Sequence, residues 1–291
     1  MISLPLGGSA APNFYSYNNP ASIGLSVYSD TTGRTQESAV IDPGERTFVA
    51  ICEGQSLAGN HQQGLYTMTH GDKVHAVNTF GDRLLYRHAE PMLGASYYNN
   101  GYAGYMSGYG SIWGEVGDKL IDGGVFDRII FCNVSYGGIY ARDVAPSGQC
   151  GHRIFLAFNV LRSLGILPSR VDAVLSMLGE SDSYDDTPTA TFVARRLETV
   201  QASRNYGFTG KWFIPTETYS FGTMSTNVST AQASLVDNGA NIYAGPNIDA
   251  IDGSGRYTQE GTPPGSGKVH LNNTGRAAAS LAWYNTLAAV Y

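Results

Sequence analysis

Residues 47–57, TFVAICEGQSL, contain an apolar run that ends in a turn. A continuous apolar run of this length, bounded by turn residues, is typical of a β-strand buried on both faces. Gly54 permits the backbone to bend sharply after the strand, and Ser56 follows directly. The stretch therefore predicts a strand of a parallel sheet with a serine hydroxyl at its carboxyl edge. Taken alone, such a serine is more often a turn or helix-capping residue.

The rest of the chain repeats this pattern of strands separated by helices. Strands are expected at 47–52, 127–134, 173–177, 211–215 and 242–245. Apolar residues at the helical period predict helices at about 154–164 and 193–200 and after Asn272. In the last helix the buried side is expected to consist of Ala277, Leu281, Tyr284 and Ala288. This alternation predicts an α/β fold, in which a parallel sheet is covered on both faces and binds its ligand beyond the carboxyl ends of the strands.

Composition and charge argue against several classes of function. With 42% hydrophobic residues among 291, the chain can bury enough apolar surface to fold. No apolar run approaches the roughly 20 residues of a membrane span, so no membrane partner is expected. A net charge of −6 without any Lys/Arg block argues against nucleic acid as a partner. Cys52, Cys132 and Cys150 lack the paired spacing of a structural zinc site.

Two segments differ in composition from the rest of the chain. Residues 1–45 are rich in Gly, Ser, Asn, Pro and Thr, with one candidate edge strand around 23–27. This segment is interpreted either as a partly ordered leader or linker, or as an arm that docks on a neighbouring subunit of a homo-oligomer. It has no basic residue before its short apolar start, so no secretory signal is expected. Residues 46–291 are expected to form one domain, with a Gly/Tyr-rich insertion at about 58–110.

Three more short motifs follow the predicted strands or precede the last helix. Gly137 and Gly138 form either a simple loop or an unobstructed backbone N–H for an oxyanion. The sequence GESDS at 179–183 is typical of a helix-capping turn. A single histidine before a helix, such as His270, is more often a surface or capping residue than a general base. Each motif is weak alone, but their order and positions are informative together.

In this order the motifs resemble the four blocks of the SGNH (GDSL-like) hydrolase superfamily. They are GQS at 54–56, GG at 137–138, GESD at 179–182, and HLN at 270–272 with a following glycine. The GQS form is similar to the branch of sialate O-acetylesterases and acetylxylan esterases. The resemblance covers about residues 46–285. It implies a three-layer α/β/α sandwich, flavodoxin-like, with a mainly parallel five-stranded sheet.

The resemblance also implies roles for individual residues in a serine hydrolase that works through an acyl-enzyme and needs neither metal nor cofactor. Ser56 would be the nucleophile and His270 the general base. The backbone N–H groups of Ser56 and Gly138 would bind the oxyanion, with Ser181 or the Gln55 side chain as the third donor. Gln55 is also a candidate for substrate binding.

The chain departs from the family pattern at the residue that orients the histidine. The family usually has an aspartate three residues before the histidine, where this chain has Gly267. The imidazole would then be held by a backbone carbonyl or by a carboxylate from elsewhere in the chain. The candidate carboxylates are Asp249, Asp252, Glu260, Glu180 and Asp182. Asp252 is preferred because it follows the fifth predicted strand at the same edge of the sheet.

The branch resemblance implies an esterase that removes acetyl or other small acyl groups from carbohydrate hydroxyls, with an acetylated polysaccharide as the expected partner. Aromatic faces for sugar rings would come from Tyr102 and Tyr105, from Tyr97, Tyr98 and Tyr109 in the same stretch, and from Trp113. The alternative for these aromatic residues is a packed loop or a subunit contact. The competing hypothesis for function is a carbohydrate-binding or structural module that has lost catalysis. It is favoured by Gly267 and by Leu178, where relatives in this branch often have a glutamine.

The arm with few charges and the loop of glycines and tyrosines resemble tail proteins of bacteriophages, some of which carry SGNH deacetylase domains. An extracellular or virion-associated location is therefore expected in preference to a cytoplasmic one. A bacterial polysaccharide or glycoconjugate esterase fits the same features.

Overall fold

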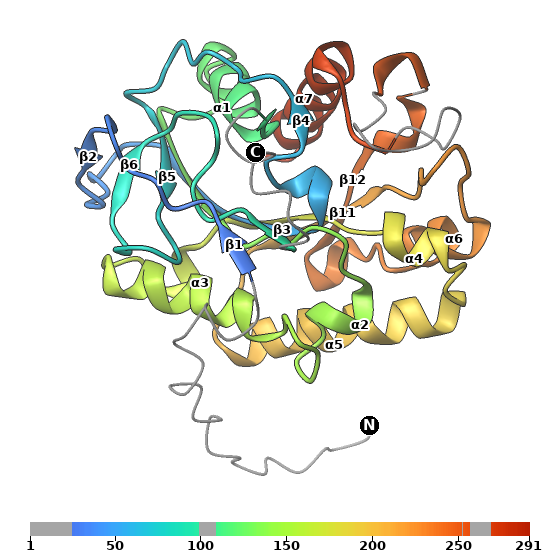
Figure 1. Ribbon diagram of the computed structural model, residues 1–291. Helices are drawn as coiled ribbons and strands as arrows, with labels where there is room; N and C mark the ends of the chain where they lie inside the picture. The colour runs from blue at the N-terminus through green and yellow to red at the C-terminus, as the bar shows by residue number, and fades with distance from the viewer. Residues whose placement is uncertain (1–24, 99–108, 252, 257–268) are drawn as a thin grey trace, which may run out of the picture.

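The computed structural model describes residues 25–98, 109–251, 253–256 and 269–291. Its main sheet has eight strands. They are β2 (Gln36–Glu37), β3 (Thr47–Gly54), β5 (Val74–Val77), β6 (Leu85–Arg87), β9 (Arg128–Asn133), β10 (Ala173–Met177), β11 (Lys211–Thr216) and β12 (Ile242–Asn247). The spatial order is β12-β11-β10-β3-β9-β5-β6-β2, and all neighbouring pairs from β12 to β5 are parallel. The predicted α/β fold with a mainly parallel sheet is confirmed (Figure 1).

The sheet is larger than the predicted five strands. The five expected segments are β3 and β9 to β12. Three further strands, β5, β6 and β2, extend the sheet beyond β9, and β6 runs antiparallel to both of its neighbours, β5 and β2. β5 and β6 belong to the segment 58–110, which was predicted to be an irregular insertion. They are four and three residues long and include His75 and Arg87, so no continuous apolar run marks them. Pairing with neighbouring strands, which is a tertiary effect, makes these short segments strands.

Two further antiparallel strand pairs are formed by residues of the segments 1–45 and 58–110. β1 (Leu25–Val27) pairs with β7 (Ser96–Tyr98), and β4 (Gln62–Gln63) pairs with β8 (Tyr109–Gly110). β1 overlaps the predicted edge strand around 23–27, and β2 places residues 36–37 of the predicted arm in the main sheet. Residues 1–24 lie outside the described residues, so docking of an arm on a second subunit stays a prediction.

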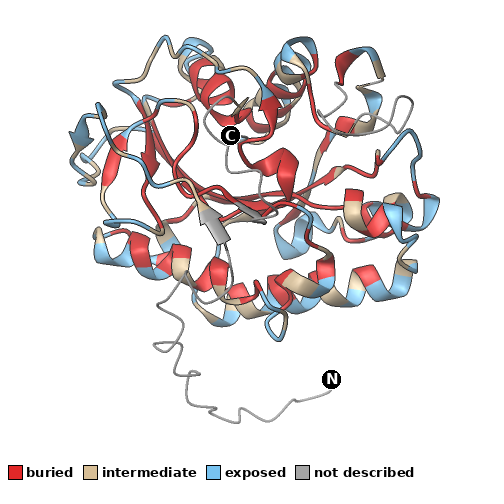
Figure 2. Ribbon diagram, in the orientation of Figure 1, coloured by how far each residue is buried: buried red, intermediate tan, exposed pale blue. Residues whose placement is uncertain are grey.

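Helices cover the two faces of the sheet because alternate residues of its strands point to opposite sides. Phe48, Ala50 and Cys52 of β3 pack in one apolar cluster, and Val49 and Ile51 pack in the other. The first cluster is covered by α1 (Trp113–Asp122) and α7 (Asn273–Ala288). The second is covered by α3 (His152–Ser163), α5 (Thr189–Asn205) and α6 (Thr226–Ser234). Figure 2 shows the resulting buried sheet between helices whose outer sides are exposed.

The buried side of the last helix, α7, differs from the predicted one. Leu281 is 49% exposed, whereas Ala279, Trp283 and Leu287 are buried. The Trp283 ring lies 5.5 Å from that of Trp113, between centroids, and decides which side of α7 faces the sheet. α7 has apolar residues on several sides, so its periodicity does not specify the buried face.

The carboxyl ends of the parallel strands meet at one edge of the sheet, where the loops after β3, β9, β10 and β11 come together. Short helices shape this edge: the 3-10 turn η3 (Ser56–Ala58), α2 (Ala141–Val144) and α4 (Glu180–Tyr184). None of the helices in the described ranges has both the length and the apolar composition needed to cross a membrane.

Candidate functional site

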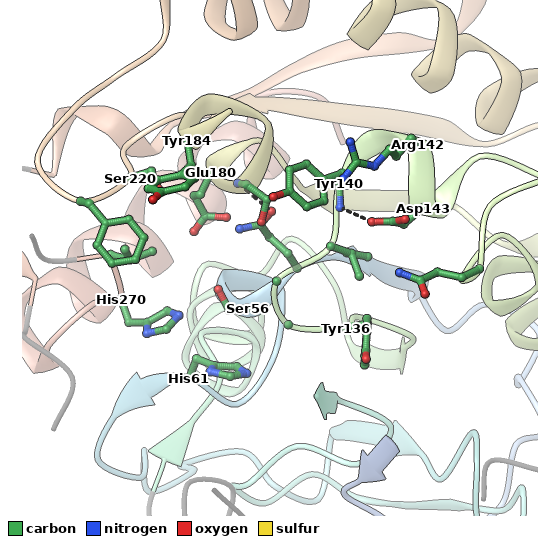
Figure 3. A pocket seen from close by; sticks show the side chains of 18 residues that line it. Ser56, His61, Tyr136, Tyr140, Arg142, Asp143, Glu180, Tyr184, Ser220 and His270 are labelled. Atoms are coloured by element: carbon green, nitrogen blue, oxygen red, sulfur yellow. Dashed lines mark hydrogen bonds between the residues drawn. The ribbon is translucent and has the colours of Figure 1, made fainter. Parts of the chain in front are cut away.

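A cavity of about 570 Å³ opens at the carboxyl edge of the sheet, and its lining includes the predicted site residues Gln55, Ser56, Gly138, Ser181 and His270. Ser56 follows β3, Gly138 follows β9 and Ser181 follows β10. His270, just before α7, lines the same cavity, more than two hundred positions from Ser56. Figure 3 shows the Ser56 hydroxyl and the His270 imidazole pointing toward the same part of the cavity. The fold therefore brings together the residues of four separate motifs.

Gly54 is the residue that lets the chain turn toward Ser56. Its φ of +133° lies outside the range that side chains favour, and a Cβ atom there would stand 1.9 Å from the carbonyl oxygen of Met177 in β10. The next N–H, that of Gln55, donates to the same carbonyl at 2.8 Å. Ser56 then begins η3 with its side chain at the cavity and is 6% exposed. Close contact between β3 and β10 thus requires glycine at the first position of the motif.

His270 is held by hydrogen bonds to the backbone on either side of it. The Arg256 guanidinium donates to the Val269 carbonyl at 2.5 Å. The Leu271 N–H donates to the Gln62 side-chain carbonyl at 3.1 Å. These bonds fix the segment that carries the imidazole, which is 6% exposed. Arg256 and Gln62 are therefore positioning residues that the sequence alone did not indicate.

A second histidine, His61, lies beside His270 and was missed by sequence reasoning. The two rings are 4.9 Å apart between centroids and inclined by 33° (Figure 3). Burial lowers the pKa of His61 to about 4. Burial, and then the nearness of His61 and of the Arg256 guanidinium, lowers the pKa of His270 well below its usual value of 6.5. Both imidazoles are therefore neutral at neutral pH, as a general base must be before it accepts a proton.

The carboxylate that would orient His270 was predicted as Asp252, which lies outside the described residues, as does Glu260. Asp249 lies within them, and its oxygens accept hydrogen bonds from the backbone N–H groups of Thr218 and Tyr219 at 2.8 and 2.9 Å. Asp182 accepts from the backbone N–H of Ala141 at 2.8 Å. These two carboxylates fix the loops after β11 and β9. Asp252 stays a prediction.

The candidate oxyanion site has Gly138 at its wall. The φ of Gly138 is +76°, so the loop needs glycine for its conformation, while the space around its Cα is open. The Ser181 backbone N–H donates to the Gln55 side-chain carbonyl at 3.3 Å, and both residues line the cavity. The first turn of α4 therefore orients Gln55, the other candidate for the third donor.

None of the aromatic residues predicted to bind sugar whose side chains the structure describes lines the cavity. Tyr102 and Tyr105 lie outside the described residues. Trp113 is fully buried, and its indole N–H donates to the Ala58 carbonyl at 2.8 Å, so its predicted role as a sugar platform is wrong. Its aromatic surface belongs to the core between the sheet and α7. The exposed aromatic residues that do line the cavity are Tyr184 and Phe221, at 66% and 46% exposure.

Two buried carboxyl groups, Glu180 and Glu217, lie next to one another behind the cavity, and Glu180 forms part of its wall. Within the described residues, no side chain or backbone group outside the pair donates a hydrogen bond to their oxygens. Burial raises the pKa of Glu180 to about 7. Burial and the adjacent Glu180 carboxyl raise the pKa of Glu217 well above its usual value. The pair therefore retains a proton at neutral pH, since two buried like charges side by side are strongly unfavourable.

Within the described ranges, no group of three or more His, Cys, Asp or Glu side chains is arranged to hold a metal ion. The chemistry available at the cavity is that of a hydroxyl, two neutral imidazoles, backbone N–H groups and a carboxyl pair.

Comparison with models of known protein families gives no match, and no curated protein matches the sequence. Solved structures do match. A protein from Arabidopsis thaliana has a TM-score of 0.57 and 14% identity, covering 83% of this chain and 97% of that chain. NanS has a TM-score of 0.52 and 14% identity, covering 86% of this chain and 98% of that chain. Identities this low bear on the fold alone. The chain shares the fold of these two solved structures, in agreement with the fold that the resemblance of its four motifs to the SGNH hydrolases implies.

Proposed function

We propose that the chain is a serine esterase that removes small acyl groups, chiefly acetyl, from the hydroxyls of a carbohydrate. The observation that carries the proposal is the meeting of Ser56, His270 and Gly138 in one cavity at the carboxyl edge of the sheet. A buried imidazole with a lowered pKa beside a serine hydroxyl is suited to take the hydroxyl proton.

The reaction would proceed in two steps. In the first, Ser56 Oγ attacks the ester carbonyl carbon, its proton passes to His270, and the C–O bond to the sugar breaks as His270 returns that proton to the leaving sugar oxygen. In the second, His270 takes a proton from water as the water oxygen attacks the acyl carbon. The bond from that carbon to Ser56 Oγ then breaks, His270 returns the proton to Oγ, and the carboxylic acid leaves. The backbone N–H groups of Ser56 and Gly138 stabilise the oxyanion in both steps, each donor contributing about 2.7 to 4 kcal/mol.

Two features support a carbohydrate as the alcohol part of the ester. The cavity wall after β9 carries polar side chains suited to sugar hydroxyls, among them Tyr140, Arg142, Asp143 and Gln149. The cavity of about 570 Å³ exceeds what an acetyl group occupies and leaves room for a sugar residue. The GQS motif at 54–56 is similar to that of the sialate O-acetylesterase and acetylxylan esterase branch, which also supports this substrate class.

The proposal is tested with a panel of esters incubated with the wild type and followed by acetate release. The panel contains p-nitrophenyl acetate, p-nitrophenyl octanoate, O-acetylated monosaccharides, and O-acetylated oligosaccharides of neutral and acidic sugars. We expect acetate release from p-nitrophenyl acetate and from at least one acetylated sugar, with the octanoate ester a poor substrate.

Failure to release acetate from any of these esters would contradict an esterase and leave the binding-module hypothesis. Hydrolysis of the octanoate ester in preference to every acetylated sugar would keep the esterase and contradict the carbohydrate substrate.

A further inference from the structure

Two exposed aromatic rings stand together at the rim of the cavity, where no core packing accounts for them. Tyr184 ends α4 and Phe221 follows β11, and their ring centroids are 5.5 Å apart at an interplanar angle of 65°. They are 66% and 46% exposed, although both line the cavity that contains Ser56. An edge-to-face pair of this kind leaves ring surface open to a ligand.

The backbone at Phe221 is held in a conformation that an aromatic residue rarely adopts. Phe221 and Gly222 have φ values of +48° and +85°, and they form a tight turn between Ser220 and Thr223. The backbone N–H groups of those two residues donate to each other's carbonyls at 2.8 and 3.0 Å. A turn with positive φ at both central positions favours Asn-Gly, and a bulky residue at the first position is strained. Phenylalanine therefore strains the backbone here while its ring stays 46% exposed, which points to a function for the ring.

The turn and the end of α4 are joined, so the two rings keep their relative positions. The backbone N–H of Ser225 donates to the Ser183 hydroxyl at 3.0 Å, and the Ser225 hydroxyl donates to Asp186 at 2.7 Å. Ser183 and Asp186 flank the end of the helix that carries Tyr184. The ring pair is thus a built feature of the cavity rim.

The position of the pair relative to Ser56 suits a neighbouring sugar residue. The start of α4 contacts the nucleophile motif, because the Ser181 N–H donates to Gln55. Tyr184 is three residues further along the helix, about 4.5 Å along its axis. In Figure 3, Tyr184 and Ser220 lie on the side of the cavity away from Arg142 and Asp143. A ligand that fills the cavity would meet aromatic surface on one side and hydrogen-bonding side chains on the other.

We propose that Tyr184 and Phe221 form a second sugar subsite, which binds the pyranose ring adjacent to the acylated residue of an oligosaccharide or polysaccharide. The C–H groups on one face of a pyranose ring form an apolar surface that packs on aromatic rings, while its hydroxyls remain at the edge for polar partners. This inference rests on the proposed function and adds to it that the substrate is a chain of sugars.

The test compares Phe221→Asn and Tyr184→Ala with the wild type on the acetylated oligosaccharide of the panel that the wild type deacetylates fastest and on p-nitrophenyl acetate. Met224→Ala is the matched control, since Met224 is on the same loop, is 60% exposed and does not line the cavity. In both variants the ratio of kcat/KM for the oligosaccharide to that for p-nitrophenyl acetate is expected to fall by about 3- to 10-fold, mainly through KM. The control is expected to keep the wild-type ratio.

Phe221→Asn also separates a binding role from a structural one. Asparagine suits the turn, so the Tm of this variant is expected to equal or exceed that of the wild type while the ratio falls. An unchanged ratio in both variants of an active enzyme overturns the subsite and leaves the proposed esterase standing. A lower Tm together with equal losses of kcat/KM on both substrates would show that the Phe221 ring has a structural role, and this result would also overturn the subsite. A wild type inactive on every ester would instead contradict the esterase, and the subsite with it.

Discussion

Replacement of Ser56 by alanine is expected to lower kcat for p-nitrophenyl acetate by about 10³-fold or more, because the variant has no oxygen that can form the acyl-enzyme. The residual rate would come from the backbone N–H groups and from binding, which the substitution leaves in place. Initial rates at saturating ester, with the enzyme concentration set by absorbance, measure the effect.

Two controls make this result specific. Ser56→Ala removes a single oxygen atom from a residue that is 6% exposed, so its Tm should stay close to that of the wild type. Ser229→Ala changes a serine on α6 whose hydroxyl donates only to a carbonyl of its own helix, and it should keep the full rate. Wild-type turnover by Ser56→Ala would exclude Ser56 as the nucleophile.

Replacement of His270 by alanine is expected to lower kcat by a similar factor, about 10³-fold or more, because the serine then has no base to take its proton. His70→Ala is the matched control. His70 pairs with Asp122 on the surface, away from the cavity, and its loss should leave the rate unchanged.

The pH profile of the wild type gives a second measurement of the same role. A base must be neutral to act, and the pKa of His270 is lowered well below 6.5 by burial, by His61 and by Arg256. The plateau of kcat/KM is therefore expected to extend below pH 6.5 before the acid limb begins, within the range where the protein stays folded. An acid limb centred above pH 6.5 would contradict the buried, neutral imidazole.

Sequence patterns predicted the strands that carry the site because those strands are buried on both faces. Residues 48–52 of β3 form a continuous apolar run, and β10 is apolar except for Ser176, which is the pattern typical of strands buried on both faces. The short strands β5 and β6 escaped prediction because His75 and Arg87 interrupt their apolar character. The buried side of α7 depended on Trp283 meeting Trp113, a contact between distant parts of the chain that no local period records.

The candidate site also contains both residues that the sequence indicates and residues that only the folded chain brings into place. Ser56, Gly138 and His270 belong to short motifs that follow strands or precede a helix, so their order along the chain could indicate a shared cavity. His61 has no motif of its own, and only the folded chain places its ring beside that of His270. Phe221 is similar, since the positive φ that singles it out is a property of the backbone rather than of the sequence.

Reaction with diethyl p-nitrophenyl phosphate shows whether Ser56 is a nucleophile activated by His270. An activated serine oxygen bonds to phosphorus, its proton passes to the base, and p-nitrophenolate leaves. We expect a single diethylphosphoryl adduct on the peptide that contains Ser56 and no adduct in Ser56→Ala. In His270→Ala the labelling rate is expected to fall by at least about 10²-fold. An adduct on a different residue, or an equal labelling rate without His270, would contradict these roles.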